Sequence, residues 1–312
     1  MDTKELFRSW NGRRYYSLDC YLKKTFDRKL YKLSLDGGMT CPNRDGKVGT
    51  GGCIFCSGGS GDFSADRRKP IDIQIEYAKA LVASKAQGCG YIAYFQAYTN
   101  TYAPVDHLER LFMPVVKRPD IDVLSIATRP DCLEPEKTEL LSRLAKIKPL
   151  WVELGLQTVH PSTAKLINRG YDLSCYDNAV RELKKIGANV IVHLILGLPF
   201  ERVEQMKESA RYVGESGADG VKLQLLHVLR GTRLEEMYNN GVFDVMTEQE
   251  YAAAVADVLT VLPPNVVIHR LTGDGNRSLL VAPLWSGHKR HVLNSIQHEL
   301  KARSVFQGSA LV

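Results

Sequence analysis

Short apolar segments alternate with longer segments of helical period through most of the chain. The short segments are rich in β-branched and aromatic residues, as strands are, and the longer ones keep one apolar face, as amphipathic helices do. This alternation predicts parallel strands joined by crossover helices, and therefore an α/β fold. Strands are expected at 30–35, 91–95, 122–127, 151–156, 190–196 and 220–226, and a seventh near 266–271 extends the sheet.

Six or seven β/α units fall short of the eight that close a complete barrel. We therefore expect an incomplete TIM barrel of the (β/α)6 type with short N- and C-terminal extensions, open on one side to a large substrate. The apolar helix faces should pack against the sheet and serve as scaffold. Three such faces are Leu140, Leu141, Leu144 and Ile147; Val180, Leu183 and Ile186, before a helix end at Gly187; and Val255, Val258, Leu259 and Leu262.

Strand alternation also predicts a polar barrel interior. Successive strand residues point to opposite faces, so in WVELGLQT the side chains of Glu153 and Gln157 lie opposite the aliphatic ones. The same holds for His193 in VIVHLILG and for Lys222 and Gln224 in GVKLQLLH. The aliphatic faces suit the outer helices, which leaves a polar lumen for a cofactor. Taken singly, His193 is equally well explained as an interior residue with satisfied hydrogen bonds.

The strongest chemical signal is the segment CPNRDGKVGTGGCIFC, which sets Cys41, Cys53 and Cys56 in a C-x(11)-C-x(2)-C pattern after the first strand. Thiolates are the ligands that hold iron–sulfur clusters, and barrel active sites lie at this end of the strands. Three ligands for four irons leave one iron open to a small molecule. Zinc that recruits a histidine or a distant cysteine is the alternative. The remaining cysteines are expected to be small buried hydrophobes: Cys20, Cys89, Cys132 and Cys175.

These residues resemble the radical S-adenosylmethionine (SAM) superfamily, in particular the branch of the elongator catalytic subunit and its small stand-alone bacterial relatives. The similarity spans about 30 to 275. It is carried by TRPD at 128–131, VELGLQT at 152–158, INRGYD at 167–172, HLILGLP at 193–199, RGTRL at 230–234, HRLTGDG at 269–275 and APLWSGHKR at 282–290. The chain departs from the commonest C-x(3)-C-x(2)-C spacing, and Gln96 to Thr101 stand where the family usually has Gly-Gly-Glu.

The resemblance implies a 4Fe-4S cluster held by the three cysteines, with S-adenosyl-L-methionine bound at the open iron. Its cleavage would give a 5′-deoxyadenosyl radical that abstracts hydrogen from the substrate. Arg169 would pair with the methionine carboxylate, the alternative being a surface arginine. The set of cofactor-binding residues that the resemblance implies is Gln96, Glu153, Gln157, Arg169, His193 and Gly197.

By the same resemblance, the substrate is tRNA, in which a carboxymethylaminomethyl group on the wobble uridine would become aminomethyl. A formal charge of +6 permits a nucleic-acid partner without requiring one. The alternatives are a small metabolite or protein substrate, and a non-enzymatic zinc-binding module. Basic residues interleaved with tyrosines suit RNA, although a solvated helix face with core tyrosines explains them equally well. They are Arg13, Arg14, Lys23, Lys24, Arg28, Lys29 and Lys32 with Tyr15, Tyr16, Tyr21 and Tyr31; Arg67, Arg68 and Lys69; and Lys289 and Arg290.

The chain as a whole suggests one catalytic domain, at 30–275, with a basic N-terminal extension at 1–29 and a C-terminal extension at 276–312 that packs on the barrel. Seven unevenly spaced cysteines do not suggest a disulfide framework. No signal peptide and no apolar stretch of about 18 residues is recognisable. We therefore expect a cytoplasmic protein without a membrane partner, served by an electron donor such as flavodoxin or ferredoxin.

Overall fold

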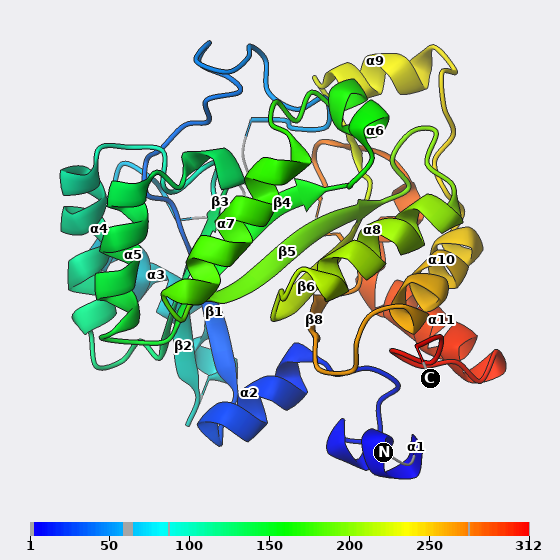
Figure 1. Cartoon of the computed structure of the whole chain (residues 1–312), viewed down its shortest axis with the longest axis horizontal. Coiled ribbons are helices and arrows are strands. Elements are labelled where there is room, and N and C mark those ends of the chain that lie inside the picture. The colour runs from blue at the N-terminus through cyan, green and yellow to red at the C-terminus, as the bar shows by residue number, and fades with distance from the viewer. Residues whose placement is uncertain (1–2, 59–64, 87, 274, 312) are drawn as a thin grey trace.

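In the computed structural model, which describes residues 3–58, 65–86, 88–273 and 275–311, one curled sheet is surrounded by helices (Figure 1). Its strands are all parallel, in the order β1-β2-β3-β4-β5-β6-β8. Because β1 and β8 form the two edges, the barrel is incomplete, as the strand count predicts. The strands are β1 (Leu30–Leu35), β2 (Gly90–Phe95), β3 (Val123–Thr128), β4 (Leu150–Gln157), β5 (Asn189–Leu196), β6 (Gly220–Leu225) and β8 (Val267–Arg270).

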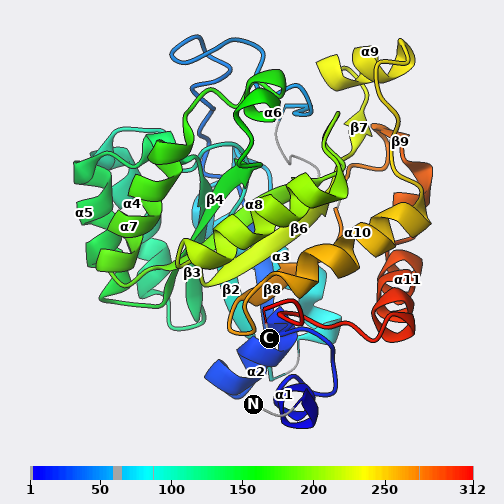
Figure 2. The same ribbon diagram turned by 45° about the vertical axis from the view of Figure 1, so that its right-hand side comes forward.

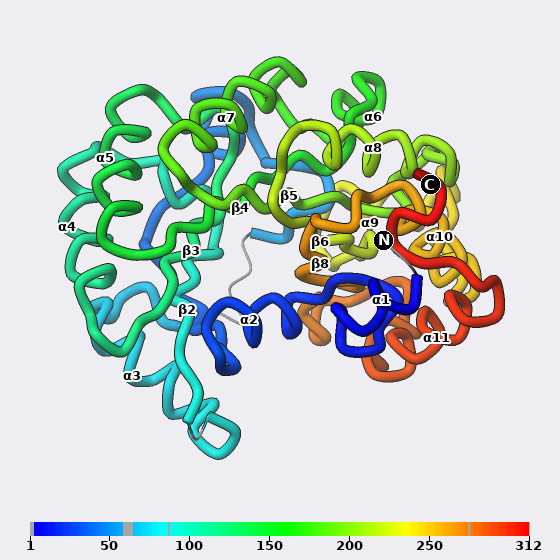
Figure 3. The backbone as a smooth tube through the Cα atoms, turned by 60° about the horizontal axis from the view of Figure 1, so that its bottom comes forward, coloured from blue at the N-terminus to red at the C-terminus, as the bar shows by residue number. Residues whose placement is uncertain are grey.

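Crossover helices form an outer layer around the sheet, which Figure 3 shows from the edge where the strands begin. The main hydrophobic core lies between the aliphatic strand faces and these helices. The helices of this layer are α3 (Ile71–Val82), α4 (Val105–Lys117), α5 (Pro135–Ala145), α7 (Leu173–Lys185), α8 (Val203–Glu215) and α10 (Glu248–Thr260). The others are α1 (Thr3–Ser9), α2 (Leu18–Phe26), α6 (Pro161–Leu166), α9 (Arg233–Asn239) and α11 (Lys289–Ala302), with 3-10 turns η2 (Ala83–Lys85), η3 (Pro130–Cys132) and η4 (Leu284–Gly287).

Most residues of the predicted helix faces are buried, and Ile186 is partly buried. The faces of α7 and α10 pack into the main core, and α7 is followed by Gly187 in a left-handed conformation, as predicted. Ile147, however, is 45% exposed because α5 ends at Ala145 and the chain then turns away. The cysteine prediction was half right. Cys20 and Cys132 are buried, whereas Cys89 and Cys175 are partly exposed.

The N-terminal segment is tied to the far end of the sheet. Tyr16 O accepts a hydrogen bond from Ile268 N (2.8 Å), and Gln307 N donates to Arg14 O (2.9 Å), so both chain ends meet near the start of β8. The basic residues of α2 and of the turn before β1 therefore lie where the strands begin (Figure 1). The cysteines follow the other end of β1, about 20 Å away for a strand of six residues. Proximity in sequence to the cysteine motif does not bring these basic residues beside it.

A second, smaller core covers the opposite end of the barrel. Two short antiparallel strands, β7 (Val228–Leu229) and β9 (Leu280–Ala282), lie with α9 beyond the end of β6 (Figure 2). Their apolar residues pack with the cysteine loop and the end of β5. This second core comprises Ile54, Ile167, Ile195, Leu198, Leu226, Val228, Leu234, Phe243 and Ala282.

Within the described part of the chain, no helix combines the length and the apolar character needed to cross a membrane. The proposed division at 29 and 275 stays a prediction. Asp274 in the HRLTGDG motif and residues 59–64 after the cysteine motif lie outside the described residues.

Candidate metal and cofactor site

The three motif cysteines come together at one cavity of about 240 Å³, at the C-terminal ends of the strands. They share its wall with residues that end or follow β2 and β3, and with residues of β4 and β5. The residues that line it are Cys41, Arg44, Gly52, Cys53, Phe55, Cys56, Gln96, Tyr98, Thr99, Ala127, Thr128, Arg129, Glu153, Gly155, Gln157, Arg169, Tyr171 and His193. The site is thus built on rigid strand ends around one long loop.

The loop that carries the cysteines is supported from two sides. Inside the loop, Gly52 has φ +83° and donates its N–H to Asn43 O (2.8 Å). Within the C-x(2)-C turn, Ile54 donates its N–H to Ile167 O (3.1 Å) and accepts a hydrogen bond from Leu234 N (2.9 Å). Ile167 begins the INRG motif and Leu234 ends the RGTRL motif. These two motifs therefore hold the cysteine turn in place.

The cysteine sulfurs lie among hydrogen-bond donors. Asn43 Nδ2 donates to Cys53 Sγ (3.7 Å), and Arg44 Nη1 donates to Cys56 Sγ (3.6 Å). Burial, followed by the neighbouring thiol of Cys56, raises the pKa of Cys53 to about 11. A bound metal reverses this effect because it stabilises the thiolate. By their chemistry, three sulfur donors at one cavity fit an iron–sulfur cluster.

The three thiols line one cavity but do not form a site for a single metal ion. Among the described residues, no three His, Cys, Asp or Glu side chains converge as they would on one metal ion. In a 4Fe-4S cluster each thiolate binds a different iron, so the cysteines surround the cluster and need not meet at one point. Three guanidinium groups, from Arg44, Arg129 and Arg169, stand in the same wall. They offset the negative charge of thiolate ligands.

Glu153 is the centre of a polar network at the floor of the cavity. Its carboxylate is fully buried and accepts hydrogen bonds from Ser125 Oγ (3.0 Å), Lys32 Nζ (3.0 Å), His193 Nε2 (2.7 Å) and Lys222 Nζ. Burial alone would raise the pKa of Glu153, but Lys222 and Lys32 hold it well below its usual value. Glu153 is therefore ionised. The predicted polar lumen is present, and Lys32, which the sequence groups with RNA-facing residues, belongs to it.

One basic member of this network is shifted toward its neutral form. Burial, and then the charge of Lys222, lower the pKa of His193 to about 4. His193 is therefore a neutral imidazole at physiological pH, oriented by its hydrogen bond to Glu153.

Most of the expected cofactor-binding residues line the cavity with the cysteines: Gln96, Glu153, Gln157, Arg169 and His193. Gly197 is not among the lining residues. Gln157 follows a register shift in β4 and has φ +70°, which is unusual for glutamine. Its Oε1 is buried and has no hydrogen-bond partner among the described residues. An unpaired buried acceptor costs about 1–3 kcal/mol, which a ligand donor would relieve.

Arg169 is buried and bonded to the backbone. Its Nη1 donates to Leu156 O (3.1 Å) and Thr158 O (2.6 Å), and its Nε and Nη2 both donate to Tyr171 O. The alternative of a surface arginine is wrong, because Arg169 is only 3% exposed. In this arrangement Arg169 fixes the segment between β4 and α7, and its pairing with a carboxylate stays a prediction.

Some residues of the wall were not expected from the sequence. Arg129 Nη1 donates a hydrogen bond to Arg169 O (2.8 Å), and its guanidinium pairs with Asp131 (2.7 Å). Its position in the TRPD motif was the sequence signal that could have identified it. Asn43 and Arg44 stand two and three residues after the first cysteine, in CPNR, and this position in the motif was the signal available for them. Tyr171 lies in the INRGYD motif and Tyr98 in the segment from Gln96 to Thr101, but the sequence analysis gave neither tyrosine a role of its own.

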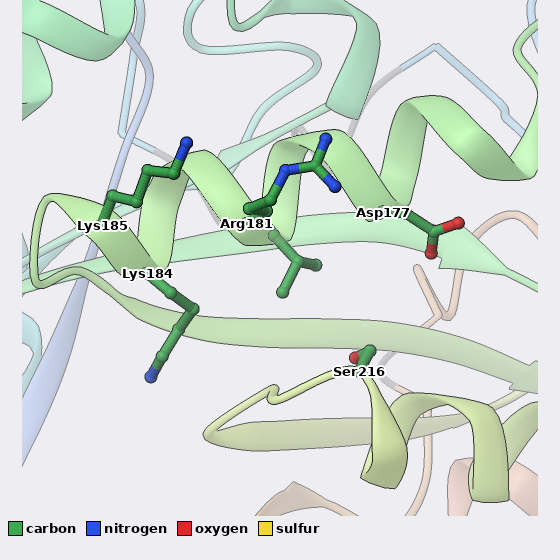
Figure 4. Close-up of a pocket in the computed structure, with 6 residues that line it drawn as sticks. Asp177, Arg181, Lys184, Lys185 and Ser216 are labelled. Atoms are coloured by element: carbon green, nitrogen blue, oxygen red, sulfur yellow. The ribbon is translucent and has the colours of Figure 1, made fainter.

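A second pocket, of about 640 Å³, lies on the outer surface between α7 and the end of α8 (Figure 4). Arg181, Lys184 and Lys185 line it and give it a basic appearance. Lys184 pairs with Asp219 (2.6 Å), and Arg181 and Lys185 pair with Glu182 (3.8 and 2.7 Å). Because these cations already have acidic partners, this pocket is a weaker ligand site than the cysteine cavity.

Comparison with known proteins places these features in one family. The model of the Radical SAM superfamily matches residues 45–213, more than half of the chain, and the Radical_SAM C-terminal domain matches residues 218–302. The uncharacterized protein YtqA of Bacillus subtilis is 44% identical over 297 residues, which cover 95% of this chain and 92% of YtqA.

More distant similarity reaches the elongator branch. A tRNA uridine(34) acetyltransferase of Methanocaldococcus infernus is 30% identical over 162 residues, which cover 51% of this chain but only 30% of the relative. The solved structure of M. infernus Elp3 with an N-terminal deletion shares the fold, with a TM-score of 0.63 and 20% identity over 75% of this chain and 59% of Elp3. The chain therefore belongs to the radical SAM superfamily, whose enzymes use a 4Fe-4S cluster and S-adenosylmethionine.

Proposed function

We propose that Cys41, Cys53 and Cys56 hold the 4Fe-4S cluster and that S-adenosylmethionine binds its remaining iron. The observation that carries the proposal is the meeting of these thiols at one cavity whose described lining contains no fourth cysteine. When bound, the two cofactors supply a carbon-centred radical that removes a hydrogen atom from the substrate. The other residues of the cavity bind and orient the cofactors and the substrate, and they exclude water.

Several residues suit the binding of S-adenosylmethionine. Arg44 offers positive charge near the cysteines, which suits the methionine carboxylate. The unpaired Oε1 of Gln157 can accept a hydrogen bond from an amine or a ribose hydroxyl. The neutral imidazole of His193, held by Glu153, presents an uncharged ring to the cavity.

We further propose that the substrate is tRNA and that the reaction converts carboxymethylaminomethyl to aminomethyl on the wobble uridine. The relative named tRNA uridine(34) acetyltransferase supports tRNA as the substrate class. On this chain, Arg230 and Arg233 are exposed and border Leu234, which contacts the cysteine turn. Arg67 and Lys69 are exposed on the segment that follows that turn. These side chains suit a phosphate backbone better than those of α2 do.

Metal analysis tests the cluster ligands. Anaerobically reconstituted protein should hold about four irons per chain, and Cys56→Ser should lose most of them. Cys175→Ser is the matched control, because Cys175 is a partly exposed thiol that does not line the cavity. Equal iron in both variants, or stoichiometric zinc in active protein, would refute the proposed ligation and favour the zinc-binding module.

Two experiments test the substrate. Nucleoside mass spectrometry of tRNA from cells with and without the gene should show loss of the modified wobble uridine, and unchanged nucleosides would refute the tRNA reaction. Binding to bulk tRNA should weaken as salt rises, since phosphate contacts release counterions. Binding that is absent at every salt concentration would favour a small metabolite or a protein as substrate.

Two further parts of the proposal concern the surroundings of the enzyme. The cluster needs a one-electron donor, for which flavodoxin or ferredoxin is the proposed class. A cytoplasmic location agrees with seven cysteines none of which forms a disulfide in the described structure. Reduction of the cluster by purified flavodoxin, followed by its visible spectrum, tests the donor.

A further inference from the structure

We infer that Asn43 and Arg44 set the reduction potential of the cluster and hold two of its thiolates. The inference rests on the ligands proposed above. Asn43 Nδ2 donates to Cys53 Sγ at 3.7 Å, and Arg44 Nη1 donates to Cys56 Sγ at 3.6 Å. Two neighbouring residues of the CPNR segment therefore donate hydrogen bonds to two different cysteine sulfurs. Neither is a metal ligand, so both are positioning residues.

The environment of Asn43 fixes its amide as a donor. The side chain is fully buried, and Nδ2 also donates to Asn168 O. Its Oδ1 is buried without a hydrogen-bond partner among the described residues. A flipped amide would bring Oδ1 against the sulfur and the Asn168 carbonyl, which are both acceptors. In the observed orientation, Oδ1 stays without a hydrogen-bond partner among the described residues, while Nδ2 donates to both the Cys53 thiol and the Asn168 carbonyl.

The glycines of the spacer provide the room that both donors need. A Cβ at Gly52 would lie 2.8 Å from Arg44 Nη1, and a Cβ at Gly49 would collide with Asn43 Oδ1. Arg44 Nη1 also donates to Cys56 O (3.2 Å), which fixes the guanidinium over the end of the C-x(2)-C turn. Glycine at these positions is thus explained by the side chains that pass over them.

The direction of the effect follows from charge. Reduction adds one negative charge to a cluster that already carries thiolate ligands. N–H donors to the sulfurs and a nearby guanidinium stabilise that added charge, and so raise the reduction potential. Removing either donor should make the cluster harder to reduce.

The test compares reconstituted wild-type protein with Arg44→Gln, Arg44→Lys, Asn43→Ala and Arg143→Gln, in the absence of S-adenosylmethionine and tRNA. Arg143 is the matched control, because its exposed guanidinium on α5 pairs with Glu109 (2.7 Å) and does not line the cavity. Iron and sulfide are counted, and the midpoint potential is measured from the electron paramagnetic resonance signal of the reduced cluster. Arg44→Gln should make reduction about tenfold less favourable, about 59 mV for one electron.

Arg44→Lys and Asn43→Ala should shift the potential in the same direction, the lysine variant by less, and Arg143→Gln should not change it. Loss of iron from Arg44→Gln alone would also support the inference, since the donor then holds the thiolate. Wild-type iron content and potential in both Arg44 variants and in Asn43→Ala would overturn it. Wild-type protein without about four irons per chain would instead overturn the proposed ligands, so the two failures are distinguishable.

Discussion

Replacing Glu153 with Gln tests whether the floor of the cavity depends on one buried negative charge. The carboxylate is fully buried and is the acceptor for Lys32, His193, Lys222 and Ser125. The Lys222 side chain is only 4% exposed, so the substitution leaves it either charged without an anion or forced to lose its proton. Breaking a buried pair in this way costs about 3–5 kcal/mol. For 312 residues, this corresponds to a fall in Tm of about 5–8 °C.

Thermal unfolding of the cluster-loaded protein under anaerobic conditions measures this effect. Glu153→Gln combined with Lys222→Met should recover part of the loss, because the double variant no longer buries an unpaired amine. Glu109→Gln is the matched control, since the Glu109–Arg143 pair (2.7 Å) is exposed and its loss should barely move the Tm. A Tm of Glu153→Gln equal to that of Glu109→Gln would refute the reasoning.

Three further predictions concern separate features. Because burial lowers the pKa of His193 to about 4, unfolding takes up a proton below about pH 6.5, and the free energy of unfolding should fall by about 1.4 kcal/mol per pH unit as the pH drops toward 4. Urea unfolding at pH 7 and pH 5 should show a smaller fall for His193→Gln than for the wild type, and an equal fall would contradict this prediction. Leu234→Ala should lower the free energy of unfolding by about 2–5 kcal/mol and release iron during gel filtration, since Leu234 is fully buried against the cysteine turn. If the variant retained as much iron as the wild type, Leu234 would not be needed to hold the cysteine turn. Phe200 has φ +67° and is 67% exposed, so Phe200→Gly should raise stability by about 1 kcal/mol, whereas a lower Tm would show that the ring has a structural role.

The sheet was largely predictable because its signals are periodic. Alternation with period two assigned Glu153 and Lys222 to the inner face, and the structure confirms both. The exposed Ile147 shows the limit of this approach, because a periodic pattern does not reveal where a helix ends. The strands β7 and β9, of two and three residues, are too short to produce any pattern.

The candidate site was predictable only in part. The spacing of the three cysteines indicated a shared ligand, and the cavity brings them together. The directions of side chains in a loop have no period, so the roles of Asn43 and Arg44 could not be inferred. Likewise, the sequence showed that Arg169 belongs to a motif, but not that backbone carbonyls would occupy its guanidinium.

The second core has a consequence for how the enzyme matures. Ile54, in the cysteine turn, packs in one cluster with Leu234 and Ala282, and β7 pairs with β9. During synthesis, the segment around Ala282 leaves the ribosome long after the cysteine turn has done so. The support of the cysteine turn is therefore completed late, and stable iron binding should wait until this segment has emerged. Ribosome-bound chains stalled before residue 280 should accordingly acquire no stable iron.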